Sequence, residues 1–444
     1  MRSLQSILRQ ARIVPQLTEL PRPEETCFLV GGAIRDWCLG RRPADFDFAT
    51  PFDPTELGRK FADRIGGTWF FLDRERRQSR VVVSSREGPL TYDFAPFRAP
   101  DLATDLSRRD FTVNAIALPL PGGETDLVDP LHGRQDLEQG LIRACSEDVL
   151  REDPLRILKG ARHALNLGFE IDPETAFWMK KQAPLLAETA PERRRNELAM
   201  ILNAGAIRPA FALLQDLGLL PVLFGPSGDR GTIEAALSLA VEAETWAETL
   251  ERTDRTGLLQ SLLRQPVEDN LSRLGLLKLA GFLRGYAAPD LRALLAGNLR
   301  LSRSNIAVLM ALTGLDPEKA TEFKSLDCGP RGQALWAGSL GLHPVEHILF
   351  LGAIAPVLRV SPERVVEVLC AYRDLEECGR IPDLVTGDWI RERLGLPQGP
   401  LIGEILGRLR LEEISARVQT PEDAEKFVLQ AAEKMVDKPK GGSL

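Results

Sequence analysis

The sequence predicts an α+β fold, in which an N-terminal mixed sheet with helices is followed by an all-α region. Between residues 27 and 145, short β-type runs alternate with helical stretches. From about Glu147 onward the β-type runs disappear, and apolar residues recur at helical spacing. The chain has 444 residues, a length typical of roughly two to four domains.

The expected elements of the first region follow one another closely. Short apolar or alternating runs predict five strands, at 27–30, 46–49, 81–84, 91–95 and 116–120. Helices are expected at 33–39 and 55–65. Beyond residue 147, Leu- and Ala-rich segments are separated by Gly and Pro signals, which predicts a long helical array. Residues 438–444 are expected to be disordered.

The composition favours a cytoplasmic protein with neither a membrane nor a DNA partner. No apolar run is long enough to span a bilayer, and the first ten residues lack the apolar core of a signal peptide. The six cysteines form no C-x-x-C pair, which argues against a zinc site and a disulfide framework. The net charge of −7 argues mildly against non-specific nucleic-acid binding but allows a local basic groove.

Asp45 and Asp47 are the candidate metal ligands. They are two residues apart on an expected strand, so their carboxylates share one face. Two adjacent carboxylates repel unless a cation lies between them, and Mg²⁺ prefers oxygen ligands of this kind. A two-metal site would align the attacking and leaving oxygens of a transfer reaction. Taken alone, the pair fits a solvated strand edge equally well.

Two further features adjoin this pair. Asp93, on another expected strand, is a candidate third ligand or general base, with an exposed strand residue as the alternative. Gly31 and Gly32 come before an expected helix, where backbone N–H groups can approach phosphates. A simple tight turn is the alternative for the two glycines.

These residues resemble the signature of a known family. Gly31-Gly32-x-x-Arg35-Asp36 with Asp45-x-Asp47 is similar to the signature of the nucleotidyltransferase superfamily that contains DNA polymerase β. More narrowly, it resembles the class II (bacterial-type) tRNA nucleotidyltransferase and poly(A) polymerase family. The resemblance implies that Gly31, Gly32, Arg35 and Asp36 contribute to nucleotide binding.

The same resemblance implies a division of the chain. It predicts a polymerase-β-like catalytic head, a base-recognising helical neck, a helical body, a tRNA-binding helical tail and a disordered end, at residues 1–146, 147–205, 206–300, 301–437 and 438–444. The match is specific over 25–205 and loose over 206–444.

The segment from Asp105 to Ala115 is the first of three further matches. It implies that Asp110 and Asn114 lie near the ribose of the incoming nucleotide, with Arg108 or Arg109 near its triphosphate. Arg suits phosphate oxygens, and Asp and Asn can satisfy ribose hydroxyls. A helix cap followed by a basic surface patch is the alternative.

The segment 151–162 resembles the E-D-x-x-R pattern with which the family reads the incoming base without a nucleic-acid template. It assigns nucleotide binding to Glu152, Asp153, Arg156, Lys159 and Arg162. Asp153 and Arg156 are expected as i, i+3 neighbours on one helix. A carboxylate accepts from the amino group of cytosine or adenine, while Arg donates to the adjacent ring nitrogen. Many relatives have Arg at the position of Lys159, which lacks the planar fork.

The segment 191–198 resembles the family's E-R-x-x-x-E-L helix. We expect Glu192, Arg193 and Glu197 to brace the base-reading residues through ion pairs.

The resemblance implies an enzyme that extends the 3′ end of tRNA from CTP and ATP with Mg²⁺. Full C-C-A addition is the leading product. Only residues 99–104 separate Arg98 from Asp105, whereas many C-C-A-adding members have a longer flexible loop there, so C-C-only addition is the first alternative. A poly(A) polymerase is the second alternative, and a catalytically idle RNA-binding protein is the third.

Overall fold

The protein is described by a computed structural model that covers residues 26–85, 88–120, 126–226, 230–255, 257–286, 290–326, 328–341, 343–354, 360–377, 384–397, 399–414 and 417–436. The tail expected at 438–444 lies outside these ranges. The chain divides into two compact units. Unit 1 comprises Met1–Gly205 and Pro209–Leu223, and unit 2 comprises Ala206–Arg208 and Phe224–Leu444. The finer division into head, neck, body and tail stays a prediction.

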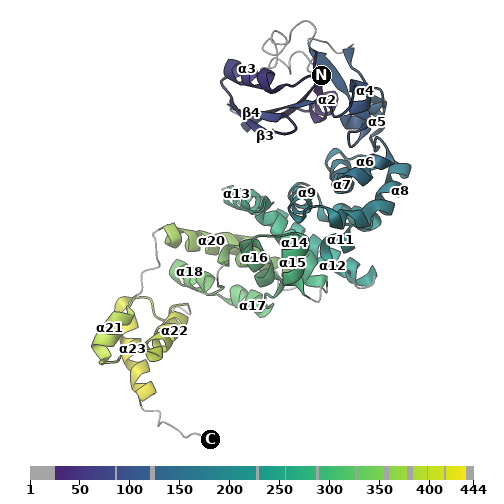
Figure 1. The fold of residues 1–444 in the computed structure, drawn as a ribbon. Helices are drawn as coiled ribbons and strands as arrows, with labels where there is room; N and C mark the ends of the chain where they lie inside the picture. The colour runs from purple at the N-terminus through teal and green to yellow at the C-terminus, as the bar shows by residue number, and fades with distance from the viewer. Residues whose placement is uncertain are drawn as a thin grey trace. The chain divides into compact units, whose positions relative to one another are not determined.

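Unit 1 contains a six-stranded mixed sheet followed by helices, as the predicted fold class requires (Figure 1). Its strands are β1 (Cys27–Val30), β2 (Asp45–Thr50), β3 (Thr68–Asp73), β4 (Gln78–Ser85), β5 (Gly88–Pro96) and β6 (Ala117–Leu120). They are ordered β3-β4-β5-β2-β1-β6, with β2 and β5 parallel and the other neighbours antiparallel. The sequence predicted five of these strands and missed β3, where four consecutive apolar residues, 69–72, obscure the alternation.

One face of the sheet packs against α3 (Thr55–Ile65). Phe61 of this helix lies edge-on against Tyr92 and Phe94, with ring centroids 5.0 and 5.6 Å apart. Phe46 stacks on Tyr92 in the same layer. Since successive residues of a strand face opposite sides, burial of Phe46 and Tyr92 against α3 turns their neighbours Asp45, Asp47 and Asp93 to the other face.

Helices and one small sheet complete the chain as far as the unit boundary. The helices are α2 (Gly32–Cys38), α4 (Leu102–Ser107), η1 (Thr112–Asn114), α5 (Gly133–Gln139), α6 (Glu147–Glu152), α7 (Leu155–Leu167), α8 (Pro173–Gln182), η3 (Ala183–Glu188), α9 (Pro191–Ala204), α10 (Ile207–Asp216) and α11 (Leu220–Phe224). The small sheet pairs β7 (Leu141–Ile142) with β8 (Glu170–Ile171) in parallel.

Two local expectations are wrong. Asp153 is not on a helix with Arg156: it follows the last residue of α6 in an extended conformation, with φ −139° and ψ 90°, and α7 begins after Pro154, at Leu155. A residue before proline disfavours the helical region, which explains the break. The segment 99–104 is not all loop either, because α4 starts at Leu102 and Asp101 caps it by accepting from the Thr104 N–H at 2.8 Å.

In its described residues, unit 2 is helical apart from a small hairpin of β9 (Pro266–Glu268) and β10 (Leu271–Ser272). Its helices are α12 (Arg230–Thr253), α13 (Leu258–Arg264), α14 (Arg273–Gly285), α15 (Leu291–Asn298), α16 (Arg303–Thr313), α17 (Glu318–Ser325), α18 (Pro330–Gly338), α19 (Pro344–Ile354), α20 (Pro362–Glu377), α21 (Gly387–Leu394), α22 (Pro400–Ile414) and α23 (Pro421–Val436). Helices α12 and α14 approach closely, since a Cβ at Gly281 would lie 2.7 Å from the Leu239 carbonyl oxygen. Within the described ranges, no helix has the length and apolar character to cross a bilayer.

Candidate active site

The three candidate carboxylates lie together on the sheet face opposite α3. The parallel pairing of β2 with β5 sets Asp47 beside Asp93, and Asp45 beside Thr91. Side chains of residues paired in this way project from the same face of a sheet. The Thr91 hydroxyl donates a hydrogen bond to the Asp45 carboxylate.

Electrostatics at Asp47 indicate that the site favours a cation. Burial raises the pKa of Asp47 above its ordinary value, and the charges of Asp93 and Asp45 raise it further, while those of Arg109 and Arg80 lower it. A carboxylate that is hard to ionise beside two others is stabilised by added positive charge. The oxygen donors of Asp45 and Asp47 therefore fit a divalent metal ion.

Asp93 is already engaged by an arginine. Arg80 of β4 donates from Nε to Asp93 Oδ1 and from Nη2 to Oδ2, both at 2.7 Å. Among the described residues, no group of three or more His, Cys, Asp or Glu side chains is arranged to hold a metal. Asp45 and Asp47 thus remain the candidate ligands, with Asp93 held beside them by Arg80.

The turn after β1 explains why glycine stands at position 31. Gly31 has φ +78°, which L side chains rarely adopt, and a Cβ there would lie 3.1 Å from Asp47 Oδ2. The backbone of the turn therefore runs directly against the carboxylate of Asp47, a candidate metal ligand. Gly32 lies under Arg35, with a Cβ position 3.4 Å from the guanidinium.

A hydrogen-bonded chain connects four of the predicted nucleotide-binding residues. Arg35 donates from Nε and Nη2 to Asp36 Oδ1, at 2.9 and 2.7 Å, and from Nη1 to Asn114 Oδ1 at 2.8 Å. Asn114 in turn donates from Nδ2 to Asp110 Oδ1 at 3.0 Å. Of these four residues, only Asp110 lines the large cleft described next.

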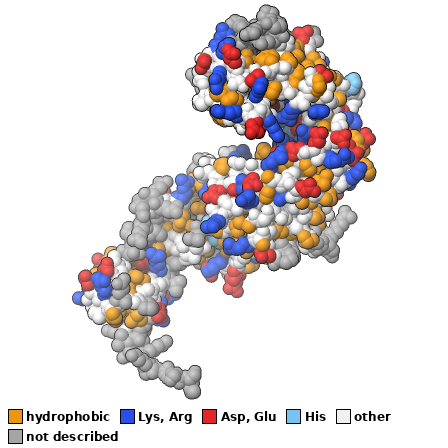
Figure 2. Space-filling view, in the orientation of Figure 1, with side chains coloured by type: hydrophobic (Ala, Val, Ile, Leu, Met, Phe, Trp, Pro, Cys, Tyr) orange, Lys and Arg blue, Asp and Glu red, His pale blue; other side chains and the backbone are white. Residues whose placement is uncertain are grey.

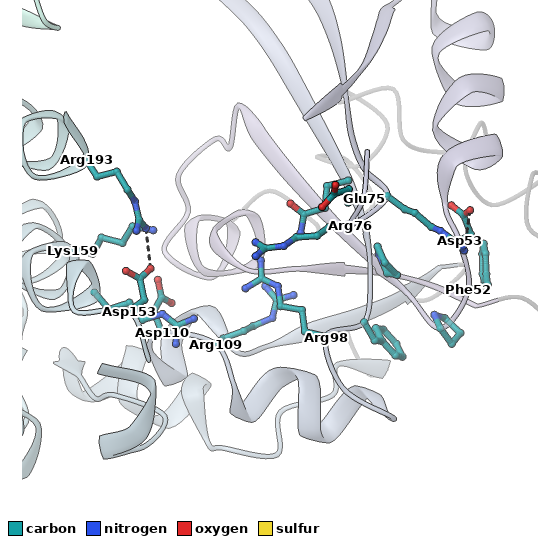
Figure 3. A pocket seen from close by; sticks show the side chains of 16 residues that line it. Phe52, Asp53, Glu75, Arg76, Arg98, Arg109, Asp110, Asp153, Lys159 and Arg193 are labelled. Carbon is teal, nitrogen blue, oxygen red and sulfur yellow. Dashed lines mark hydrogen bonds and ion pairs between the residues drawn. The ribbon is translucent and has the colours of Figure 1, made fainter. Parts of the chain in front are cut away.

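A polar cleft of about 1050 Å³ opens beside the carboxylates (Figure 3). Its side chains come from the ends of β2 and β5, the β3–β4 turn and the helices α7 and α9. They are Pro51, Phe52, Asp53, Glu75, Arg76, Arg77, Gln78, Pro96, Phe97, Arg98, Arg109, Asp110, Asp153, Arg156, Lys159 and Arg193. Seven are cationic and four are acidic, so the lining has a net positive charge that suits a polyphosphate. Lys and Arg side chains also gather in the hollow of unit 1 in the space-filling view (Figure 2).

A smaller hollow of about 120 Å³ joins this cleft to the carboxylates. Asp47 and Asp93 line it, and Arg98 and Arg109 line both spaces. The predicted Arg109 therefore lies between the face that carries the three carboxylates and the cleft. Arg108 does not line the cleft; it donates to the Arg98 carbonyl oxygen at 3.2 Å.

Arg98 is a functional candidate that the sequence does not single out, since it stands there only as the residue before the 99–104 connection. Burial lowers the pKa of Arg98, and the charges of Arg109, Arg156 and Arg76 lower it further, against the effect of Asp105. A buried guanidinium among other cations is stabilised by a bound anion. Buried Asp105 fixes the backbone at Arg98 and the side chain of Arg109: its Oδ1 accepts from the Arg98 backbone N–H at 2.8 Å, and its Oδ2 accepts from Arg109 Nη2 at 3.3 Å.

Asp153 and Arg156, the candidates for reading the base, both line the cleft, although α6 ends just before Asp153 and α7 begins only at Leu155. Asp153 accepts from Arg193 Nη2 of α9 at 2.9 Å, drawn as a dashed line in Figure 3. Arg156 donates from Nη1 to the carbonyl oxygens of Arg108 and Val149, at 3.1 and 3.2 Å. Both side chains are thus anchored by protein atoms while they face the cleft. Lys159 also lines it, where it faces Asp110.

Two other predicted residues lie outside the cleft lining. Arg162 donates from Nε to buried Glu197 of α9 at 2.7 Å, so it ties α7 to α9. Glu152 is exposed at the end of α6. The pairs Arg193–Asp153 and Arg162–Glu197 are bracing contacts of the kind expected for the 191–198 helix.

Comparisons with known proteins agree with this geometry. Residues 27–143 match the family model "Poly A polymerase head domain", and residues 168–230 match "Probable RNA and SrmB- binding site of polymerase A". The CC-adding tRNA nucleotidyltransferase of Geobacter sulfurreducens is 32% identical over 421 residues, covering 90% of this chain and 91% of that protein. The A-adding tRNA nucleotidyltransferase of Deinococcus radiodurans is 33% identical over 435 residues, covering 91% and 95%.

The fold is shared as well. A solved structure of a CCA-adding enzyme with CTP superposes with a TM-score of 0.70 at 20% identity, covering 97% of this chain and 99% of that one. The chain therefore belongs to the class II, bacterial-type family of tRNA nucleotidyltransferases and poly(A) polymerases, and it is a nucleotidyltransferase.

Proposed function

We propose that this enzyme adds two cytidines to the 3′ end of tRNA from CTP, by two-metal-ion transfer without a nucleic-acid template. The observation that carries the C-C product is the short connection from β5 to α4. Only Phe97–Asp101 separate the two elements, and Asp105 and the Asp101 cap fix its ends. The connection is therefore too short to form a loop that could switch the site from binding CTP to binding ATP.

The relatives support this choice without deciding it. The Geobacter sulfurreducens protein is named as CC-adding, and so is a Synechocystis protein that is 28% identical over 408 residues. The Deinococcus radiodurans protein is named as A-adding. Full C-C-A addition, the leading expectation from the sequence, is therefore the second candidate.

In the proposed mechanism Asp45 and Asp47 hold Mg²⁺. Bound Mg²⁺ would neutralise the charge that develops on the phosphate oxygens as the 3′ hydroxyl displaces pyrophosphate from the α-phosphate. Arg98 and Arg109 bind the triphosphate in the space between the carboxylates and the cleft. Asp93, beside Asp47 and oriented by Arg80, is the candidate acceptor for the proton of the 3′ hydroxyl.

Base choice is assigned to Asp153 and Arg156. The Asp153 carboxylate accepts from the exocyclic amino group of cytosine, and Arg156 donates to the adjacent ring nitrogen, so uracil and guanine present the wrong groups. Arg193 orients the Asp153 carboxylate through their ion pair. Asp110 and Asn114, in the chain that runs from Arg35, are assigned to the ribose. With tRNA as the substrate, we place the enzyme in the cytoplasm.

The test uses three tRNAs, ending at the discriminator base, after one C and after two C residues. Each is incubated with CTP alone, ATP alone, or both, with Mg²⁺, and the product lengths are resolved. We expect two C residues on the first tRNA, one on the second and none on the third, with no A added. A single A on the third tRNA would establish the C-C-A or A-adding product, and repeated A residues would establish a poly(A) polymerase. If no nucleotide is incorporated under any condition, the protein would instead be a catalytically idle RNA-binding protein.

A further inference from the structure

The face that carries the carboxylates continues to the open edge of the sheet. Strand pairing sets Phe70 beside Arg80, Arg80 beside Asp93, and Asp93 beside Asp47. These four side chains therefore form one row across β3, β4, β5 and β2. Because neighbouring strands lie about 4.8 Å apart, Phe70 is roughly 10 Å from Asp93 along this row.

The edge strand exposes large apolar side chains on this face. Phe70 is 41% exposed and Leu72 is 47% exposed. Trp69 and Phe71, on the opposite face of the same strand, pack edge-on with ring centroids 4.7 Å apart. Arg59 lies 4.4 Å above the Trp69 ring. An apolar surface left open beside a candidate active site is a feature of binding sites.

We propose that Phe70, with Leu72 beside it, forms the stacking surface for the 3′-terminal base of the RNA that is extended. This inference rests on the proposed function. The incoming nucleotide is assigned to the arginine-lined cleft, and the RNA must bring its 3′ hydroxyl to the same carboxylates. The surface of β4 and β3 extends from those carboxylates on the sheet face they share, and Leu72 lines the small hollow together with Asp47 and Asp93.

The chemistry of the surface fits a single-stranded RNA end. Proteins bind unpaired bases by stacking them on aromatic rings, without preference for one base. Such tolerance is needed here, because the first addition extends the discriminator base, which differs among tRNAs, and the second extends a cytosine. Arg80 lies between Phe70 and Asp93, so its positive charge is close to where the RNA backbone would run. A second copy of the chain pairing along the edge of β3 is the competing occupant.

The test measures the dissociation constant of two RNAs for the wild type and for Phe70→Ala, Phe70→Trp and Arg59→Ala. One RNA is a tRNA ending in two unpaired residues, and the other is the same tRNA trimmed to its paired acceptor stem. We expect Phe70→Ala to weaken binding of the first RNA roughly tenfold, the scale of one lost stack, and to leave binding of the trimmed RNA unchanged. Phe70→Trp should bind both as the wild type does. Arg59→Ala, on the opposite face, controls for a general disturbance of the strand.

Three results would overturn the inference: equal binding of the longer RNA by Phe70→Ala and wild type, an equal loss for both RNAs, or a dimer in gel filtration that Phe70→Ala dissociates. In the same series, Phe70→Ala should raise KM for tRNA and leave KM for CTP unchanged. A rise confined to CTP would assign Phe70 to the incoming base instead. C incorporation by the wild type is scored separately, so loss of the proposed function and loss of the stacking site give different results.

Discussion

Arg80 holds both carboxylate oxygens of Asp93 at 2.7 Å, one strand away from Asp47. A cation is therefore fixed within the group of three aspartates. The hydrogen bonds that Arg80 donates to Asp93 raise the pKa of Arg80 most, and the charges of Asp93, Asp45 and Asp47 raise it further. Arg80 thus supplies part of the positive charge that a metal ion would supply.

Replacing Arg80 with Gln should tighten metal binding while it slows the reaction. Loss of one cation leaves the carboxylates more negative, so Mn²⁺ should bind roughly three- to tenfold more tightly without nucleotide. Asp93 would lose its orientation, so kcat should fall. Calorimetric titration with Mn²⁺ measures the first effect. Arg77→Gln, which removes a partner of Asp53 instead, is the matched control, and equal Mn²⁺ affinity in both variants would contradict the expectation.

Asp45→Asn should abolish addition and leave tRNA binding intact. The amide keeps the size of the side chain but removes the charge that a divalent ion needs, and loss of several kcal/mol of metal stabilisation lowers kcat by about 1000-fold or more. Single-turnover incorporation of labelled CTP and a filter-binding assay separate the two effects. Asp63→Asn, an exposed carboxylate on α3, should behave as the wild type. An Asp45→Asn enzyme with near-normal kcat would remove Asp45 from the metal site.

Much of unit 1 could be predicted because its signals are local. The alternation of Asp45 to Phe48 fixes which side chains face α3, and α3 itself begins and ends at the predicted residues. The shared face of Asp45 and Asp47 follows from the same alternation. The neighbouring position of Asp93 does not, because it depends on parallel pairing between strands that lie more than 40 residues apart in the chain.

The error at Asp153 has a local origin instead. Pro154 lies three residues into the segment 151–162, whose apolar residues recur at helical spacing. That spacing predicts one continuous helix, although a proline disfavours the helical conformation in the residue before it. Arg98, Arg76 and Arg193 are unremarkable as single residues. They become a cluster only when the end of β5, the β3–β4 turn and α9 meet at the cleft. The partner of Asp153, Arg193, was predicted as a brace because the motif that carries it was recognised.

Arg98→Ala should weaken nucleotide binding. Arg98 lies among other cations, and a triphosphate relieves that repulsion while accepting charged hydrogen bonds. KM for CTP should rise roughly tenfold, with KM for tRNA changed less than twofold. Steady-state kinetics with each substrate varied in turn measure both. Lys60→Ala, which removes an exposed cation of α3 paired with Glu56, is the control. A change in KM for tRNA alone would instead place Arg98 on the RNA path.

His163 should make unit 1 less stable in mild acid. Burial lowers the pKa of His163 to about 3, and the charge of Arg162 contributes to the shift. Since the unfolded chain takes up this proton near pH 6.5 and the folded chain does not, the stabilising effect is complete above that pH and is lost as the pH falls. From pH 7 to pH 5 the loss is about 2 kcal/mol. Urea unfolding at both pH values should show it for the wild type and not for His163→Gln; equal pH dependence would refute the assignment.

Asp153→Asn should change which nucleotide is used rather than how fast the enzyme works on a good one. An amide can donate to the carbonyl group that uracil carries where cytosine has its amino group, so the site would lose its means of rejecting UTP. A site discriminates strongly against a substrate that leaves its buried polar groups unpaired. We therefore expect the preference for CTP over UTP, measured as the ratio of their kcat/KM values, to fall by roughly 10- to 100-fold in Asp153→Asn.

The companion variant Arg193→Gln tests how far Asp153 depends on its ion pair when it reads the base. It keeps the Asp153 carboxylate but removes the ion pair at 2.9 Å, so discrimination should fall less than in Asp153→Asn. Asp148→Asn, an exposed carboxylate whose partner is Arg151 of the same helix, should retain the wild-type preference. Competition assays with CTP and UTP on one tRNA give all the ratios directly. An unchanged ratio in Asp153→Asn would show that the base is read elsewhere in the cleft, and Lys159, which also lines it, would be the next residue to replace.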